Sequence, residues 1–213
     1  MAYQNTFRRL SLNYLRRCPS KQGISYSSLE SLIPRFARPS KDQQANFYTK
    51  SGLLTATKNG SWIQLNFPAE PIIESEYPSE LIEALNISPI YVGRNRFDYF
   101  IKIESENVIK NLSPNFSLLG TIQTRGIIVT SKSNEFDFIS RCFFPAAGVN
   151  EDPVTGSAHC GLAPYWSRKL NKTEMYAYQA SARGGVLKIN LQNDRVVMAG
   201  QAATVMKSEL LIV

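Results

Sequence analysis

Residues 150–166 have the sequence NEDPVTGSAHCGLAPYW, and the interpretation of the rest of the chain depends on this stretch. A carboxylate pair, a proline and a Thr-Gly-Ser step precede a largely apolar segment, which is typical of a polar loop leading into a buried helix. The first N–H groups of a helix lack intrahelical partners and lie at the positive end of its dipole, so they can bind an anion. The same spacing also fits an ordinary turn that caps a helix.

Individual residues of this stretch suggest chemistry at the helix start. Gly156 lets a ligand approach the backbone closely, and Ser157 can cap the helix or bind the ligand. Asp152 lies near enough to exchange a proton with a bound group. His159 can contact a ligand, or a neighbouring group can satisfy it within the helix. Cys160 is expected to be a small packing residue rather than a nucleophile.

The composition describes a soluble globular protein. The 213 residues are 43% hydrophobic and 19% charged, which allows one large domain or two smaller ones with ample core. No apolar run reaches the roughly 18–20 residues of a membrane helix. The three cysteines lack a Cys-x-x-Cys pair, and His159 is the only histidine. We therefore expect reduced thiols, no metal site and a cytoplasmic location.

The positive charge is concentrated at the N-terminus. The formal net charge is +7, of which residues 1–45 carry +6. This Arg- and Ser-rich segment fits an organelle transit peptide, a basic disordered arm or a stretch never selected to fold. Nucleic acid is the least favoured partner, because the arm lacks the aromatic interleaving of a single-strand binder and the body is near neutral. We expect no nucleic-acid and no membrane partner.

Two similar hairpins are predicted. Residues 52–57 and 62–67 are strands around Lys58-Asn59-Gly60, and Asn-Gly supplies the positive backbone dihedrals of a tight turn. Residues 184–200 repeat this design. The similarity suggests a duplicated α+β unit.

The best predicted helix covers residues 157–170. Pro164 removes one of its internal hydrogen bonds, which predicts a kink or two short helices meeting there. Further strands are expected at 90–92, 99–103, 126–130 and 137–145, short helices at 79–85 and 107–112, and a linker at 34–44.

Four segments in order resemble the signature of the phenazine-biosynthesis PhzF-like family. They are RCFFP at 141–145, EDPVTGSAH at 151–159, APYW at 163–166 and QASARGG at 179–185. The EDPVTGSAH block is too specific to be a chance match. Weaker similarity extends over residues 47–213 and leaves the N-terminus unmatched.

The resemblance implies an α+β, diaminopimelate epimerase-like fold, in which two related domains each wrap a curved, mostly antiparallel sheet around a central helix. It suggests an unmatched basic segment at 1–45, a remnant of an incomplete first domain at 46–88 and the second domain at 89–213, and it allows the last strands to return to the first domain. An incomplete first domain would expose core residues, so we expect poor solubility or a homodimer.

The resemblance also implies a cofactor-independent isomerase or epimerase that moves a proton on a small, carboxylate-bearing substrate in biosynthesis. Asp152 resembles the acid/base residue of the cleft or its orienting partner. Gly156 and Ser157, with Thr155 beside them, resemble the anion-binding helix start. His159 completes the expected substrate-binding set, and no cofactor or metal is implied.

Two motifs of the family do not occur in this sequence. They are a glutamate within a Leu-Ser-Glu-Thr-like motif and a Gly-His-Ala-Thr motif, and divergence cannot hide the second because His159 is the only histidine. Proton transfer between two faces of a carbon needs groups on both sides of a cleft. Two hypotheses follow: an active isomerase in which another group replaces the glutamate, and an inactive, truncated relative that binds a small anion or acts as an interaction domain.

Overall fold

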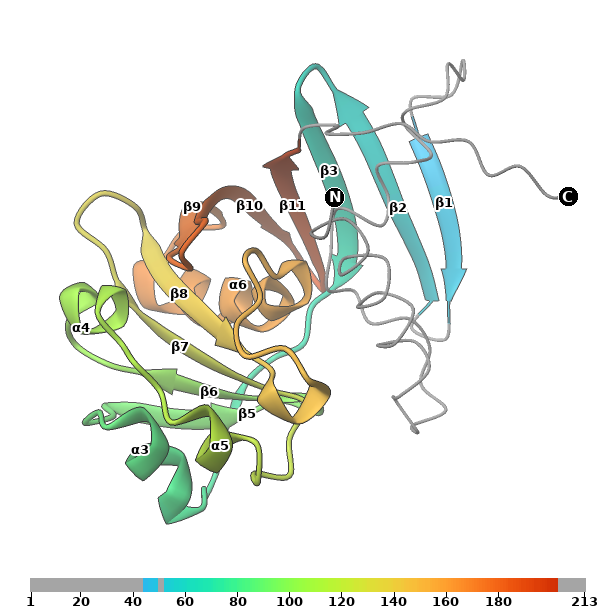
Figure 1. The fold of residues 1–213 in the computed structure, drawn as a ribbon. Coiled ribbons are helices and arrows are strands. Elements are labelled where there is room, and N and C mark those ends of the chain that lie inside the picture. Colours follow the sequence, from blue (N-terminus) through green and yellow to red (C-terminus); the bar gives the residue numbers. More distant parts are fainter. Residues whose placement is uncertain (1–43, 50–51, 203–213) are drawn as a thin grey trace, which may run out of the picture.

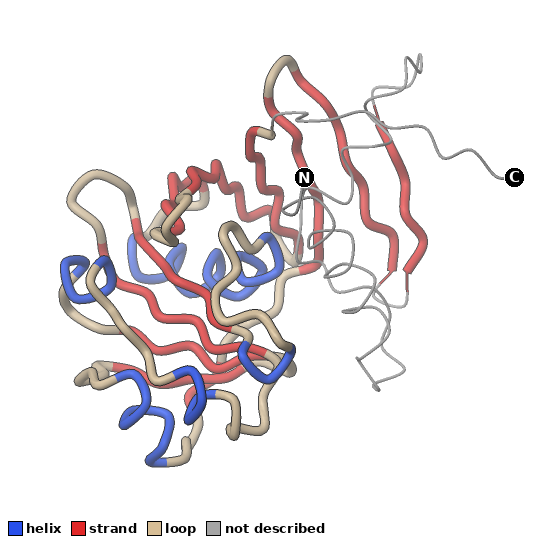
Figure 2. Tube along the Cα trace, viewed as in Figure 1, coloured by secondary structure: helices blue, strands red, loops and turns tan. Residues whose placement is uncertain are grey.

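The computed structural model describes residues 44–49 and 52–202, and eleven strands in this part of the chain form one sheet (Figures 1 and 2). The strand order is β1-β2-β3-β11-β10-β9-β8-β7-β6-β5-β4. The strands are β1 (Gln44–Thr49), β2 (Gly52–Asn59), β3 (Trp62–Pro68), β4 (Ile73–Glu74), β5 (Tyr91–Arg94), β6 (Asp98–Lys102), β7 (Gly126–Lys132), β8 (Phe138–Phe143), β9 (Glu174–Gln179), β10 (Gly185–Gln192) and β11 (Arg195–Gln201). The helices are α3 (Ser79–Leu85), α4 (Glu106–Lys110), α5 (Phe116–Leu119) and α6 (Gly156–Leu170), with a 3-10 turn η2 (Pro145–Ala147).

Both expected hairpins form, and they lie next to each other in the sheet. The β2–β3 turn uses Gly60 at φ 60°, and the β10–β11 turn uses Asn193 at φ 54°, so each tight turn contains the left-handed residue that it requires. Strand β11 pairs antiparallel with β3, which places Met198 opposite Leu65. The last strands therefore join the first hairpin, while the domain boundaries at 45 and 88 stay a prediction.

The rest of the sheet is mostly antiparallel and has helices on both faces. Strands β6 and β7 pair parallel, as do β8 and β9, and the other neighbours pair antiparallel. In Figure 1, α6 lies on the inner side of the curved sheet, and α3, α4 and α5 lie on the other side of β5–β8. This arrangement agrees with an α+β fold that wraps a sheet around one central helix.

Alternate residues of the central strands belong to two cores. Phe100 and Ile128 pack in the core that contains α6, whereas Ile101 and Val129 pack in the core beneath α3, α4 and α5. Because successive side chains of a strand point to opposite faces, each strand serves both layers. These strands are near-continuous apolar runs for that reason.

Helix α6 is anchored in its core by Trp166. This side chain is 2% exposed, stacks on Phe138 at 5.5 Å between ring centroids, and donates from Nε1 to Oγ1 of Thr130 at 3.0 Å. Truncating a buried aromatic side chain of this size costs about 3–5 kcal/mol.

Helix α6 runs unbroken through Pro164, so of the two expected outcomes, a kink or two short helices, the second is wrong. Proline has no N–H to give to the carbonyl oxygen of Cys160, four residues earlier. The backbone N–H of Glu70 donates to that oxygen instead, at 2.9 Å. The carbonyl oxygen that the proline leaves without a helical donor thus attaches the segment after β3 to the helix. The helix ends at Asn171, whose φ of 52° is a left-handed C-cap.

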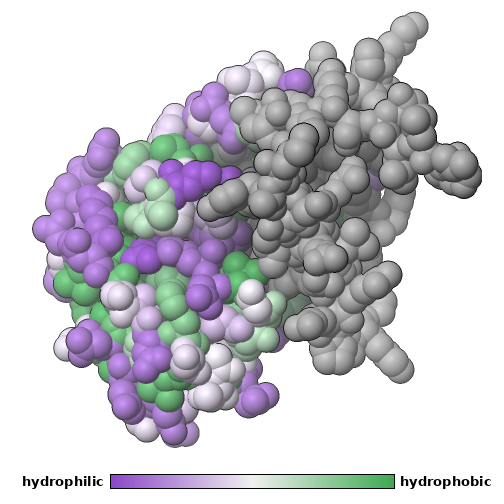
Figure 3. All heavy atoms as spheres, viewed as in Figure 1, coloured by the Kyte–Doolittle hydropathy of each residue, from purple (hydrophilic) through white to green (hydrophobic). Residues whose placement is uncertain are grey.

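Three strands differ from the sequence expectations. β1 begins at Gln44, inside the expected linker, and β4 and β9 were not expected. The basic segment 1–45 lies outside the described residues except for its last two. On the face drawn in Figure 3, hydrophilic and hydrophobic side chains are interspersed over the described surface. None of the described helices is long and apolar enough to cross a membrane.

Candidate functional site

The loop after β8 brings Asp152 back against the end of that strand. The backbone N–H of Asp152 donates to the carbonyl oxygen of Cys142 at 3.0 Å. Arg141 of β8 donates from Nε and Nη2 to the two carboxylate oxygens of Glu151, at 2.7 and 2.8 Å, and from Nη1 to the carbonyl oxygen of Leu112 at 2.5 Å. Glu151 is therefore the anchor of the loop, which leaves Asp152 as the adjacent carboxylate at the helix start.

Thr155 connects Asp152 to the start of α6. Its hydroxyl Oγ1 donates to Oδ2 of Asp152 at 2.6 Å. Thr155 occupies the N-cap position, where a threonine side chain normally accepts from the first helical turn, yet it makes no such capping bond. The first turn also contains no acidic residue. The N–H groups at Gly156 and Ser157 therefore have no side-chain cap, which suits an anion.

A pocket reaches this helix start. Ser157, 9% exposed, borders it, and the wall combines apolar side chains with one ion pair. The lining residues are Leu54, Phe67, Pro68, Glu70, Arg96, Phe97, Ser157 and Cys160. Asp152, Thr155 and Gly156 are not among these lining residues, so Ser157 is where the pocket meets the helix start.

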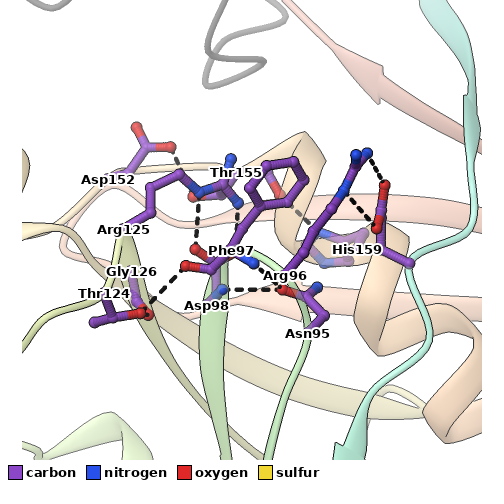
Figure 4. A network of polar contacts seen from close by, with 11 residues as sticks. Asn95, Arg96, Phe97, Asp98, Thr124, Arg125, Gly126, Asp152, Thr155 and His159 are labelled. Carbon is purple, nitrogen blue, oxygen red and sulfur yellow. Dashed lines mark hydrogen bonds and ion pairs between the residues drawn. The ribbon is translucent and has the colours of Figure 1, made fainter. Parts of the chain in front are cut away.

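One wall of the site is an aromatic ring between two arginines (Figure 4). The guanidinium carbons of Arg96 and Arg125 lie 4.4 and 4.6 Å from the ring centroid of Phe97. Arg125 donates from Nε to Oδ1 of Asp98 at 2.8 Å, and Arg96 donates from Nε to Glu70 at 3.0 Å. Asp98 is 0% exposed, and a buried carboxylate needs such a partner. Charged residues at every second position, Arg94, Arg96 and Asp98, are the sequence signal that could have pointed to this wall.

His159 lies inside α6 and not on the surface of the site. It is 0% exposed, and Nδ1 lies 2.8 Å from the carbonyl oxygen of Thr155, so Nδ1 carries the hydrogen. Nε2 has no hydrogen-bond partner among the described residues. Burial lowers the pKa of His159 to about 4, against the opposing effect of its bond to Thr155, so the ring is neutral at pH 7. Direct contact with a ligand stays a prediction.

The two described cysteines are buried free thiols. Burial raises the pKa of Cys160 to about 12. It raises the pKa of Cys142 well above its ordinary value, although a hydrogen bond with Thr155 opposes this. Neither side chain is a thiolate at neutral pH, so Cys160 is a packing residue, as expected.

Gln179, at the end of β9, is a site residue that was not expected from the sequence. Its Nε2 donates to the carbonyl oxygen of Asp152 at 2.7 Å and to Oγ1 of Thr155 at 3.1 Å, and its Oε1 accepts from the N–H of Thr155 at 2.7 Å. Nearby, Oγ of Ser181 donates to the carbonyl oxygen of Pro153 at 2.8 Å. The QASARGG segment was the available signal, since it contains both residues. The described residues hold no cluster of three or more His, Cys, Asp or Glu side chains that could bind a metal ion.

Comparison with known proteins gives this chain a family context. The sequence model of the phenazine biosynthesis-like protein family matches residues 28–208. A Halalkalibacterium halodurans protein named an uncharacterized isomerase is 68% identical over 176 residues, which are 81% of this chain and 66% of that protein. The chain spans just under two thirds of the length of such relatives.

Solved structures agree with the fold. A PhzF-family phenazine biosynthesis protein of Enterococcus faecalis has a TM-score of 0.81 and 34% identity, covering 89% of this chain and 74% of that chain. A probable proline racemase of Agrobacterium radiobacter has a TM-score of 0.51 at 10% identity, covering 85% of this chain and 65% of that chain, which shows the fold alone. The expected diaminopimelate epimerase-like fold is confirmed.

Proposed function

The chain belongs to the phenazine biosynthesis-like protein family, and on this premise we propose that it is an isomerase or epimerase that moves a proton on a small, carboxylate-bearing substrate. Several relatives carry the name isomerase, and the fold is shared with a probable proline racemase. The substrate's carboxylate binds at the start of α6, and Asp152 is the acid/base residue.

The orientation of the Thr155 hydroxyl supports this proposal most strongly. The hydroxyl donates to Asp152 and does not cap α6, so the N–H groups at Gly156 and Ser157 are left for an anion. A carboxylate held there lies next to the Asp152 carboxyl group. General acid–base catalysis requires a substrate in a fixed position with a proton-accepting group beside it, and this arrangement supplies both.

The remaining candidates support this pair. His159 donates to the carbonyl oxygen of Thr155 from inside the helix and so stabilises the N-cap residue. Proton transfer through a carboxyl group needs no cofactor, and we propose none. The buried free thiols of Cys142 and Cys160 agree with a reducing compartment, so the proposal includes the cytoplasm. It also includes a biosynthetic reaction, because the matching family is named for phenazine biosynthesis.

A second function also has an observation in its favour. The glutamate motif and the Gly-His-Ala-Thr motif of the family do not occur in this sequence. A chain that supplies groups on only one side of the substrate would bind a small anion at Gly156 and Ser157 without moving a proton.

Deuterium incorporation separates the two functions. The chain is incubated in heavy water with a panel of small amino and hydroxy carboxylates, beside Asp152→Asn and the control Asp194→Asn, which makes the same change at an exposed turn residue. If the chain is an isomerase, we expect deuterium exchange that Asp152→Asn abolishes and Asp194→Asn preserves. Saturable carboxylate binding without exchange would favour the inactive relative.

A further inference from the structure

Gln179 is a fully buried side chain whose hydrogen bonds go to two residues of the site. It is 0% exposed and donates from Nε2 to Asp152 O and Thr155 Oγ1, while Oε1 accepts from Thr155 N. An amide group has two hydrogens to donate and one oxygen that accepts. Both hydrogens and the oxygen of Gln179 are therefore engaged with the acid/base residue and the N-cap of α6.

These contacts fix the direction of the hydrogen bond between Thr155 and Asp152. The nitrogen of an amide donates and does not accept, so Oγ1 of Thr155 accepts from Gln179. The single hydroxyl hydrogen is then directed to Oδ2 of Asp152, 2.6 Å away. The result is an ordered chain from Gln179 through Thr155 to the carboxylate.

Strand β9, which carries Gln179, is bonded to β8, and the residues that follow it are bonded to the loop that carries Asp152. Ser140 of β8 pairs with Gln179, and its carbonyl oxygen accepts from the N–H of Ala180 at 2.8 Å. Further along, Ser181 bonds the carbonyl oxygen of Pro153. The backbone at Gln179 is thus fixed relative to β8 and the loop, which fixes the point from which its side-chain amide extends.

We propose that Gln179 is the positioning residue of the site: it holds Asp152 and the start of α6 in one geometry and directs the Thr155 hydroxyl at the carboxylate. The inference rests on the proposed function, because it concerns the same proton transfer. Gln179 does not touch the substrate. It fixes the distance between the anion-binding N–H groups and the group that moves the proton, and a misplacement of about 1 Å costs about 100-fold in rate.

The choice of an amide has a physical reason. A carboxylate at this position could still accept from Thr155 N, but it could not donate to Asp152 O or to Thr155 Oγ1. The Thr155 hydroxyl would then turn toward the new carboxylate and leave Asp152. Gln179→Glu therefore removes the donors while it retains the acceptor, and Gln179→Leu removes both.

The first experiment compares kinetic constants for deuterium exchange. Gln179→Glu is expected to lower kcat about 100-fold and to leave KM within about threefold, because the helix start is still held. Gln179→Leu is expected to raise KM as well. Thr155→Val should lower kcat about as much as Gln179→Glu does. Thr155→Ser retains the hydroxyl group, so its kcat should stay near that of the wild-type chain. Gln192→Glu, at an exposed position of β10, is the matched control.

The second experiment needs no activity and uses the 15N signals of the side-chain amides. The Gln179 amide hydrogens are expected to exchange slowly with solvent, and their signal should shift in Asp152→Asn and not in Asp194→Asn. Thr155→Val should shift it too and speed its exchange. An amide signal that exchanges as fast as that of exposed Gln192 and ignores Asp152→Asn would overturn the proposal.

The two experiments also distinguish failure of the proposed function from failure of the positioning role of Gln179. Absence of exchange in the wild-type chain would refute the proposed function, while the amide signals would still decide whether the hydrogen-bond chain exists. Exchange in the wild-type chain with unchanged kcat in Gln179→Glu would refute the positioning role alone. Because Gln179→Glu places a carboxylate in the interior, its unfolding curve is compared with that of Thr155→Val, which adds no charge.

Discussion

Acidification tests whether α6 buries a neutral histidine, because His159, the only histidine of the sequence, belongs to this helix. The folded chain holds His159 neutral with a pKa of about 4, whereas in the unfolded chain the group has its ordinary value of 6.5. Between these values the unfolded state binds a proton that the folded state does not. The folded pKa is the lower one, so the stability is intact above pH 6.5 and is lost as the pH falls toward 4.

The magnitude follows from the difference between the two values. Each pKa unit corresponds to about 1.4 kcal/mol, so His159 should cost the folded state about 3 kcal/mol by pH 4. The variant His159→Gln retains a side-chain N–H for the carbonyl oxygen of Thr155 and has no group that titrates in this range. The free energy of unfolding of the wild-type chain should therefore fall by about 3 kcal/mol more than that of the variant.

Urea unfolding from about pH 7 to about pH 4 measures this difference, and the variant cancels the contribution of the carboxylates. A second readout is the C2 proton signal of histidine, which needs no assignment because the sequence has one histidine. In the folded chain this signal should titrate near pH 4. Parallel curves for the two proteins, or a midpoint near pH 6.5 in the folded chain, would refute a buried neutral His159.

Substitutions at two further positions test the loop that carries Asp152. In Gly185→Ala the new Cβ would lie 2.4 Å from Cγ2 of Val154, so we expect a loss of about 1–3 kcal/mol in urea unfolding and a lower rate of exchange; an unchanged rate would contradict this packing. Arg141→Met leaves the Glu151 carboxylate and the Leu112 carbonyl without their donors, which should cost about 3–5 kcal/mol. Arg141→Lys should not restore the loss, because lysine cannot make the bidentate pair; full recovery in urea unfolding would argue against the fork.

Local patterns predicted much of the fold. The Asn-Gly turn predicted β2–β3, and the apolar spacing after Ser157 predicted α6 to within a residue of its observed start at Gly156. Strand β9 was missed because its inward residues, Met175 and Ala177, are weak strand signals. Its place is set by pairing with β8 and β10, which no local pattern contains.

The local geometry of the candidate site was predictable where one stretch of chain contains its residues, while their roles in binding and catalysis stay a proposal. Asp152, Thr155, Gly156 and Ser157 are neighbours in sequence, and the structure brings them together as a loop and a helix start. Gln179 is 24 residues from Thr155, so only the sheet register shows that they touch. His159 could be placed on the helix from sequence, but its orientation toward Thr155 depends on packing against Phe138.

The most direct test of the central claim follows binding and exchange in one sample. A small amino or hydroxy carboxylate that exchanges deuterium is titrated into the 15N-labelled chain in heavy-water mixtures, beside Asp152→Asn. The account predicts saturable shifts of the Gly156 and Ser157 amide signals in both proteins, with exchange only in the wild-type chain. Unmoved Gly156 and Ser157 signals, or equal exchange in Asp152→Asn, would contradict it.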